Sequence, residues 1–277
     1  MKIAIVGLGV IGGSFAMALK KAGYDEVYGI DIDESTITKA KSIGIIKDGC
    51  TKGNEILKEA DLVIISIYPK LIKKFILENK LNFKKGAVIT DTTGIKGLFI
   101  KEILEILPNS VDFIFGHPMA GREKKGLDFA SNEVFNGANY ILINSEFNKV
   151  ENIELLESII YSIGFSKIRK VSADFHDEII SYTSQLPHAL AVALINSDEN
   201  NRATGDFIGD SYRELTRIAN INDELWCELF IGNKKNLLKS IDDFTIELNK
   251  IKKSIESEDS NELIELFRQS SSRRQKL

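Results

Sequence analysis

Apolar and polar positions follow two different patterns along this chain. Up to about residue 171, short runs of β-branched and other apolar residues alternate with stretches of helical periodicity; such runs are typical of strands buried on both faces of a sheet. The predicted strands span residues 2–6, 27–30, 61–67, 87–91, 113–116, 139–143 and 166–171. The predicted helices span residues 15–22, 33–42, 96–107 and 153–163. This alternation predicts an α/β fold with a doubly wound parallel sheet and helices on both faces.

The pattern changes near residue 172, after which only helical periodicity remains. It covers residues 175–195, 222–255 with an expected break, and 261–267, whereas the polar tail 270–277 is expected to be solvated and frayed. We therefore predict a sheet domain over residues 1–171 and an all-helical domain over residues 172–277. Long apolar helices in a small module often complete their core against a second copy, so we expect a homodimer joined through the helical domain.

A glycine-rich turn directly follows the first predicted strand. Its residues are Gly7, Leu8, Gly9, Val10, Ile11 and Gly12, which match the pattern G-x-G-x-x-G. Gly7 allows the tight turn, Gly9 lets a pyrophosphate approach the backbone, and Gly12 lets the following helix pack on the strand. The unpaired N–H groups at the helix start then favour a phosphate. The turn predicts a Rossmann-type dinucleotide site in residues 1–171, with a glycine turn that binds nothing as the alternative.

An acidic residue completes this motif at the end of the second predicted strand. Asp31 lies about 20 residues beyond the glycines, where a carboxylate can bond both hydroxyls of the adenosine ribose. Ile32, Asp33 and Glu34 follow, so there is no basic residue immediately after it to pair with a 2′-phosphate. We therefore expect NAD rather than NADP as the cofactor.

The composition is that of a globular protein able to bury a sizeable core. Of 277 residues, 43% are hydrophobic and 27% are charged. The net charge of −4 gives no general attraction to nucleic acid or to an anionic membrane, and no apolar run is long enough to span a bilayer. Because the chain opens directly into a core strand, we expect no secretory signal and a cytoplasmic protein. Cys50 and Cys227 are far apart without metal-ligand spacing, so no metal site is predicted.

Residues that follow the predicted strands are the candidates for ligand binding. In an open α/β sheet, ligands bind beyond the carboxyl ends of the strands. We expect Ser66, Tyr68 and Pro69 after one strand, and Asp91 and Thr92 at the end of the next, to bind the cofactor.

The most informative strand end is the stretch 116–126, Gly-His-Pro-Met-Ala-Gly-Arg-Glu-Lys-Lys-Gly. It holds one of only three histidines in the chain, His117, which we predict to lie in a loop at the strand end. A neutral imidazole with an ordinary pKa near roughly 6.5 would accept a hydroxyl proton while nicotinamide takes a hydride. A loop histidine that bonds only the backbone is the alternative.

The other two histidines, His176 and His188, fall on the first predicted helix of the helical domain. His176 is interpreted as a packing or helix-end histidine. Pro187 removes a backbone hydrogen bond, so we expect a kink that frees a carbonyl beside His188. Arg213 and Arg217 are one helical turn apart and are predicted to project from one face as a fork for carboxylates. A solvated or salt-bridged face is the alternative for this pair.

Together, these motifs resemble one family, the prephenate dehydrogenases of tyrosine biosynthesis with their arogenate-specific and dual-specificity relatives. The resemblance covers nearly the whole chain and rests on the order and spacing of the motifs. The matching segments are 7–12, 91–96, 117–123, 176–177, 186–188 and 216–219, followed by Trp226 and Asn233.

The resemblance implies an oxidoreductase that decarboxylates prephenate, or arogenate in some relatives, while a hydride passes to NAD⁺. It implies that His117 draws off the proton of the ring hydroxyl, that Arg217 holds a substrate carboxylate and that His188 lines the substrate site. Glu123 matches a family acid near the site entrance, with Trp226 close to it. The resemblance also implies a dimer joined through the helical domain.

Three positions depart from the family pattern. Gly94 replaces a serine of many relatives, so a hydroxyl contact to substrate and to the catalytic histidine is missing unless Thr93 or Thr92 supplies it. Gln185 stands where many relatives have histidine, and Arg213 where some have lysine. Thr93, Gly94, Gln185 and Arg213 remain candidates for substrate binding. The chain ends soon after the helical domain, so we expect neither a regulatory domain nor a fused chorismate mutase.

Two other functions remain open at this point. A β-hydroxyacid dehydrogenase shares the two-domain layout, but that class uses a catalytic lysine on the helical domain and lacks the His-Pro-Met-Ala-Gly stretch. A redox-sensing protein that binds NAD(H) without turnover is the alternative from another class. Convergence of His117, His188 and Arg217 on the nicotinamide site would argue against it. Prephenate and arogenate differ only in a keto or amino group on the side chain, and both remain possible substrates.

Overall fold

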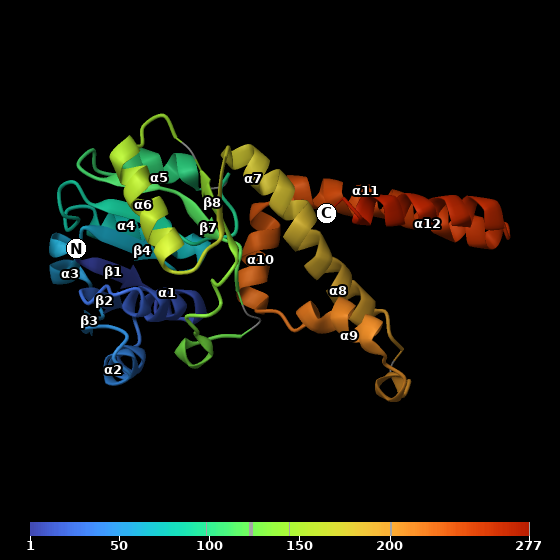
Figure 1. Ribbon diagram of the computed structural model, residues 1–277, viewed down its shortest axis with the longest axis horizontal. Helices are drawn as coiled ribbons and strands as arrows, with labels where there is room; N and C mark the ends of the chain where they lie inside the picture. Colours follow the sequence, from blue (N-terminus) through green and yellow to red (C-terminus); the bar gives the residue numbers. More distant parts are fainter. Residues whose placement is uncertain (98, 122–123, 144, 200, 277) are drawn as a thin grey trace.

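The computed structural model describes residues 1–97, 99–121, 124–143, 145–199 and 201–276, in which a sheet domain is followed by a helical region (Figure 1). Within these residues, the main sheet has six parallel strands in the order β3-β2-β1-β4-β5-β6. The strands are β1 Ile3–Val6, β2 Val27–Ile30, β3 Asp48–Cys50, β4 Leu62–Ile65, β5 Val88–Asp91 and β6 Asp112–Ile114. The helices of this domain are α1 Val10–Lys21, α2 Glu34–Ser42, α3 Asn54–Glu59, α4 Pro69–Asn79, α5 Ile100–Ile106 and α6 Val150–Ser162. The predicted doubly wound parallel sheet is confirmed.

Strand β1 lies in the middle of the sheet and joins its two halves. It pairs with β2 on one side and with β4 on the other. Ile3 and Ile5 face a core formed with α1, α2 and α6, whereas Ala4 and Val6 face a core formed with α3, α4 and α5. A strand covered on both faces has to be apolar at every position, which explains the uninterrupted run. The strand order reverses beside β1, which places a ligand crevice at its carboxyl end.

The three strands after β6 form a second, mixed sheet that the sequence pattern did not predict. These strands are β7 Gly116–Pro118, β8 Asn139–Ile143 and β9 Lys167–Val171. β7 runs antiparallel to β8, and β8 runs parallel to β9. The predicted strand 113–116 is therefore divided between β6 and β7. A Cβ at Gly116 would lie 2.3 Å from the Tyr140 hydroxyl, so only glycine fits where the chain enters the second sheet. His117 lies within β7, paired with Ile141, and the predicted loop position is wrong.

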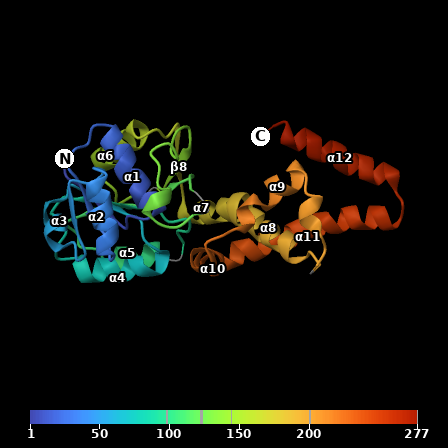
Figure 2. The ribbon, with the colours of Figure 1, turned by 90° about the horizontal axis from the view of Figure 1, so that it is seen from below.

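The helical region begins with two helices joined by a π-helical turn. α7 Ala173–Ile180, the turn Ser181–Gln185 and α8 Leu186–Asn196 follow one another without a gap. The other helices are α9 Asp210–Thr216, α10 Asp223–Gly232, α11 Lys234–Glu256 and α12 Ser260–Arg274, with short 3₁₀ turns at Leu127–Phe129, Thr204–Asp206 and Arg217–Ala219. Figure 2 shows α11 and α12 as a hairpin that extends away from the sheet domain. The expected break falls between α10 and α11, and the tail expected to fray is helical as far as Arg274.

Some helices differ in length from the prediction for identifiable reasons. α5 begins at Ile100 rather than at residue 96, and the N–H groups of Lys96 and Gly97 ahead of it donate to the carboxylate of Asp177 on α7. α4, which was not predicted, carries Pro69 in its first turn, a position where the missing N–H costs nothing. Among the described residues, none of the helices combines the length and the apolar character that crossing a membrane requires.

The glycine turn after β1 shows which of its glycines the fold requires. Gly7 has a φ of +86°, and a Cβ there would lie 2.5 Å from the Ser66 carbonyl oxygen. A Cβ at Gly12 would lie 1.8 Å from the carbonyl oxygen of Gly7. In contrast, a Cβ at Gly9 meets no atom within 4 Å. Gly7 and Gly12 are thus required by packing, whereas Gly9 faces open space.

This contrast predicts unequal effects of two matched substitutions on stability. Gly12→Ala should lower the free energy of unfolding by at least about 2 kcal/mol, because α1 has to move away from the turn. Gly9→Ala should change it by less than about 1 kcal/mol, because the new methyl group occupies empty space at the start of α1. Denaturant unfolding of both variants measures the difference. Equal destabilisation by the two substitutions would contradict the packing described here.

Candidate active site

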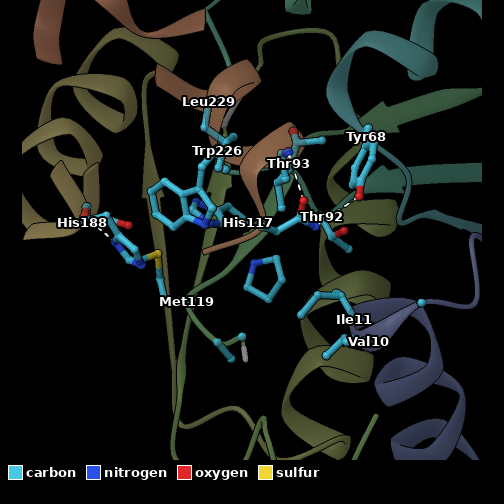
Figure 3. A pocket seen from close by; sticks show the side chains of 18 of the residues that line it. Val10, Ile11, Tyr68, Thr92, Thr93, His117, Met119, His188, Trp226 and Leu229 are labelled. Carbon is cyan, nitrogen blue, oxygen red and sulfur yellow. Dashed lines mark hydrogen bonds between the residues drawn. The ribbon is translucent and has the colours of Figure 1, made fainter. Parts of the chain in front are cut away.

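A cavity of about 610 Å³ lies between the carboxyl edge of the main sheet and the helical region. Figure 3 shows Val10 and Ile11 of α1 on one side of it and Trp226 and Leu229 of α10 on the other. Contacts across the cavity join its two walls. The Asn222 side-chain amide donates to the Tyr68 hydroxyl at 3.1 Å. Lys70 Nζ, two residues further along the chain on α4, pairs with Glu228 of α10 at 2.9 Å. Both domains therefore contribute to the site.

The start of α1 and the end of β2 form a site for a phosphate and a diol. The Leu8 N–H donates to Asp31 Oδ2 at 2.7 Å, and the Asp33 N–H donates to Asp31 Oδ1 at 3.0 Å. The carboxylate is thereby held at the tip of the glycine turn, and each oxygen retains a lone pair for a ligand hydroxyl. The open space at Gly9 lets a phosphate reach the N–H groups of α1. The residues present thus fit the pyrophosphate and ribose of a dinucleotide.

The structure distributes the expected cofactor residues over three positions. The cavity is lined by Gly9, Val10, Ile11, Ser66, Tyr68, Pro69 and Thr92. Gly7, Leu8 and Gly12 form the turn behind the lining, and Asp31 lies at the tip of that turn. Asp91 is fully buried and does not line the cavity, so any effect on a ligand passes through its neighbours.

Asp91 and its neighbours form a buried network around an ion pair with Lys96. Lys96 is fully buried, and its Nζ donates to Asp91 Oδ2 at 2.5 Å, to the Gly116 carbonyl oxygen at 2.6 Å and to Thr93 Oγ1 at 3.0 Å. Asp91 Oδ1 accepts a hydrogen bond from the Gly116 N–H at 3.1 Å. Burial lowers the pKa of Lys96, and the charge of Asp91 opposes that effect. The network fixes both backbone groups of Gly116 and hence the position of the next residue, His117.

His117 contacts the cavity with one ring nitrogen and a second histidine with the other. Its Nδ1 lies 2.9 Å from His176 Nε2, and a Cβ on Gly94 in the cavity wall would lie 3.6 Å from its Nε2. Burial, and then the charges that His176 and Lys96 can carry, lower the pKa of His117 well below the usual 6.5. The imidazole is therefore neutral at physiological pH, and the expected ordinary pKa is corrected downwards.

The second histidine is part of a chain of polar contacts that the sequence did not suggest. His176, interpreted as a packing or helix-end residue, is fully buried, and its Nδ1 lies 2.7 Å from Asp177 Oδ1. Asp177 in turn accepts hydrogen bonds from the Lys96 N–H at 2.8 Å and the Gly97 N–H at 2.7 Å. The available signal was the dipeptide His-Asp in the first turn of a helix that follows a strand, but spacing alone does not place it behind His117.

The helical wall of the cavity is formed around His188 and Trp226. Their rings stack with centroids 3.6 Å apart and an angle of 28° between the planes. The His188 Nδ1 lies 2.9 Å from the Ser184 carbonyl oxygen, in the π-helical turn that precedes Pro187. The turn accommodates the proline and leaves a carbonyl beside the histidine, as the sequence predicted.

Gln185 also lines the cavity, but its amide holds two helices together. Its Nε2 donates to the Leu229 carbonyl oxygen at 3.0 Å, and its Oε1 accepts from Asn233 Nδ2 at 2.9 Å. Asn233 Nδ2 also donates to the Asp177 carbonyl oxygen at 2.7 Å. Gln185 therefore links the π-helical turn to α10 beside the cavity.

The structure separates the two arginines that were expected to form a fork. Arg217 lines the cavity, whereas Arg213 is exposed and pairs with Asp210 at 3.1 Å. Arg213 lies on α9, which ends at Thr216, whereas Arg217 begins the 3₁₀ turn that follows. Of the two arginines, only Arg217 lines the cavity.

The hydroxyls of both threonines beside Gly94 have hydrogen-bond partners within the protein. Thr93 Oγ1 donates to the Asp91 carboxylate and is buried with it. Thr92 Oγ1 donates to Ser66 Oγ at 3.2 Å. The glycine leaves His117 Nε2 open to the cavity. Glu123, expected at the site entrance, lies outside the described residues.

Comparisons with known proteins show the family to which the chain is similar. The family model of the prephenate dehydrogenase nucleotide-binding domain matches residues 15–168, and that of the prephenate dehydrogenase dimerization domain matches residues 172–269. The prephenate dehydrogenase of Bacillus subtilis (strain 168) is 29% identical over 273 residues, which are 96% of this chain and 73% of that protein.

Solved structures are similar over the whole chain. Prephenate dehydrogenase from Aquifex aeolicus in complex with hydroxyphenyl propionate and NAD⁺ is 29% identical, with a TM-score of 0.90 over 100% of this chain and 98% of that chain. Synechocystis arogenate dehydrogenase is 26% identical, with a TM-score of 0.83 over 100% of this chain and 99% of that chain.

Proposed function

The chain belongs to the prephenate dehydrogenase family, and we propose that it catalyses the NAD⁺-dependent oxidative decarboxylation of prephenate to 4-hydroxyphenylpyruvate. The observation that carries the proposal is the position of His117, whose Nε2 opens into a cavity lined also by Gly9 of the glycine turn and by Arg217. A proton acceptor, a dinucleotide site and a cation for a carboxylate are the groups that this reaction requires.

The residues of the chain handle one proton and one carboxylate. NAD⁺, when bound at the glycine turn, supplies the hydride acceptor. As the hydride leaves the ring carbon, the attached hydroxyl becomes strongly acidic, and His117 Nε2 accepts its proton. The ring carboxylate then leaves as carbon dioxide, the ring becomes aromatic, and the proton returns to the phenolic oxygen. Arg217 holds a carboxylate of the substrate, while His188 and Trp226 line the wall beside it.

The substrate assignment favours prephenate over arogenate. Both molecules carry a ring hydroxyl for His117 and carboxylates for Arg217, so the same site would accept either. The B. subtilis relative named above is a prephenate dehydrogenase, which supports prephenate as the preferred substrate. Arogenate dehydrogenase activity is the second candidate, because the Synechocystis enzyme has the same fold over its full length.

The proposed enzyme is a cytoplasmic homodimer. A dimerization-domain model matches residues 172–269. Large apolar side chains are exposed along the helices of this region, among them Leu238, Ile246 and Phe267. Contact with a second copy would bury such side chains and provide the missing part of the core.

The direct test is an assay of the purified protein with prephenate and NAD⁺. We expect NADH absorbance to rise together with 4-hydroxyphenylpyruvate and carbon dioxide. Parallel assays with arogenate decide between the two substrates by their kcat/KM values. A protein that binds NAD⁺ but forms no NADH with either substrate would instead be the redox-sensing alternative.

The carboxylate at the end of β2 predicts a preference between cofactors. Asp31 favours two free ribose hydroxyls and repels a 2′-phosphate, and Asp33 and Glu34 add negative charge. We expect kcat/KM to favour NAD⁺ over NADP⁺ by at least about tenfold, which is about 1.4 kcal/mol. Steady-state kinetics with both cofactors at saturating prephenate measures this ratio. Equal use of the two cofactors by the wild-type enzyme would refute the role of Asp31.

The separation of the two arginines predicts unequal losses of substrate binding. Arg217→Ala should cost about 2–5 kcal/mol in kcat/KM for prephenate, because a substrate carboxylate would lose its partner in a desolvated cleft. Arg213→Ala should cost less than about 1 kcal/mol, because this side chain forms an exposed pair with Asp210. Affinity for NAD⁺, measured by fluorescence titration, is the control and should hardly change in either variant. An unchanged KM for prephenate in Arg217→Ala would show that the proposed contact does not exist.

The buried imidazole predicts an unusual pH profile. Only neutral His117 accepts a proton, so activity falls when the pH drops through the pKa of His117. Because that pKa lies well below 6.5, we expect the loss of activity only at acidic pH. His117→Asn should lower kcat by about 10²–10⁴ and remove this acidic limb, with NAD⁺ affinity retained. A folded variant that binds NAD⁺ and keeps kcat within about threefold of wild type would end the assignment of His117 as the base.

A further inference from the structure

We infer that His176 is a positioning residue, which keeps His117 in the tautomer whose Nε2 is unprotonated and directed into the cavity. Asp177 in turn keeps His176 in the tautomer that is protonated at Nδ1. The inference deepens the proposed function, because it rests on His117 as the proton acceptor of that reaction. It concerns the state of the ring before any substrate binds.

The argument begins at Asp177, whose two carboxylate oxygens are held by the backbone. Oδ1 accepts from the Lys96 N–H at 2.8 Å, and Oδ2 accepts from the Gly97 N–H at 2.7 Å. His176 Nδ1 lies 2.7 Å from Oδ1. Because a carboxylate only accepts hydrogen bonds, His176 Nδ1 has to carry a hydrogen.

The next contact follows from the tautomer of His176. Burial lowers the pKa of His176, and this ring has only one hydrogen when it is neutral. With that hydrogen on Nδ1, its Nε2 is an acceptor. His117 Nδ1, 2.9 Å away, then has to donate. The one hydrogen of neutral His117 is thereby placed on Nδ1, and its Nε2 is left with a lone pair toward the cavity.

The same contacts stabilise His117 after it has accepted the hydroxyl proton. The imidazolium keeps its Nδ1–H directed at His176 Nε2, and the negative charge of Asp177 lies behind that ring. Lys96 opposes this, because its buried ammonium disfavours a second positive charge nearby, while Asp91 balances Lys96. The proton moves from the substrate oxygen to His117 Nε2 and back to the phenolic oxygen, so the two histidines are unchanged after each turnover. A buried aspartate fixes the histidine tautomer of serine proteases by the same logic.

The competing explanation is that His176 and Asp177 only hold α7 against the segment 96–97. On that explanation, a side chain that fills the same volume would preserve activity. The tautomer of His117 would then depend on solvent and not on His176.

The first experiment needs no variant of the positioning residue. Protein labelled with ¹⁵N-histidine has only three imidazoles to observe. Long-range ¹H–¹⁵N spectra at neutral pH, assigned with single substitutions, should show both His117 and His176 protonated at Nδ1 and unprotonated at Nε2. A wild-type His117 that is protonated at Nε2 would overturn the proposal.

The second experiment separates the acceptor from the volume it occupies. His176→Phe keeps a ring but has no acceptor, so kcat should fall about 10²-fold with KM values for NAD⁺ and prephenate within about threefold, and His117 should become partly protonated at Nε2. His176→Gln offers a carbonyl oxygen to His117 Nδ1 and should recover at least about tenfold of the lost kcat. If the His176→Phe variant does not fold, the tautomer of His117 in the wild-type spectrum and the kcat of His176→Gln test the proposal instead.

Ser172→Ala is the matched control in the same helix. Ser172 Oγ accepts from the Phe175 N–H at 3.2 Å at the start of α7 and touches neither imidazole. Its loss should leave kcat and the His117 tautomer unchanged. A His176→Phe variant with kcat within about threefold of this control would overturn the proposal. Absence of prephenate turnover in the wild type would refute the proposed function instead, because the tautomer is measured without substrate.

Discussion

The buried ion pair between Asp91 and Lys96 is the interaction on which the geometry of the site depends. Both side chains are fully buried, and through Gly116 they attach the second sheet to the end of β5. The backbone N–H of the same lysine binds Asp177 and so attaches the helical region. Removing one partner of such a pair leaves a charge without compensation and typically costs about 3–5 kcal/mol. One short segment, residues 91–97, thus fixes the sheet, the strand of His117 and the helix behind it.

This arrangement has an electrostatic consequence for the chemistry. Lys96 keeps a positive charge close to His117, which together with burial makes the imidazole a weak base. A weak base is always in its competent neutral form at physiological pH, but it attracts a proton less strongly. The proposed reaction tolerates this, because the departing hydride turns the ring hydroxyl into a strong acid. In the proposed reaction, His117 is therefore neutral at every turnover, and the acidity of the substrate hydroxyl drives the proton transfer.

The sequence predicted those features that depend on local patterns. The apolar runs, the roles of Gly7 and Gly12 and an irregularity of the helix next to Pro187 each follow from neighbouring residues, and the structure contains them all, the last as a π-helical turn. The features that were missed depend on contacts between distant segments. β7 joins a separate sheet because it pairs with β8, and His176 meets His117 across 59 positions of sequence. The end of α9 just before Arg217 was missed because a change from α-helix to 3₁₀ turn leaves no clear mark on residue spacing.

Gly94 makes the tautomer of His117 more important in this chain than a serine would. A hydroxyl beside the imidazole is both a donor and an acceptor, so it would bond to either tautomer and could orient the substrate by itself. Here the position has no side chain, and the hydroxyl of Thr93 is committed to Asp91. In the proposed reaction, the ring hydroxyl of the substrate therefore relies on His117 Nε2 to accept its proton. His117 Nε2 has to be unprotonated for this, and the contacts of His117 Nδ1 with His176, and of His176 with Asp177, favour that state.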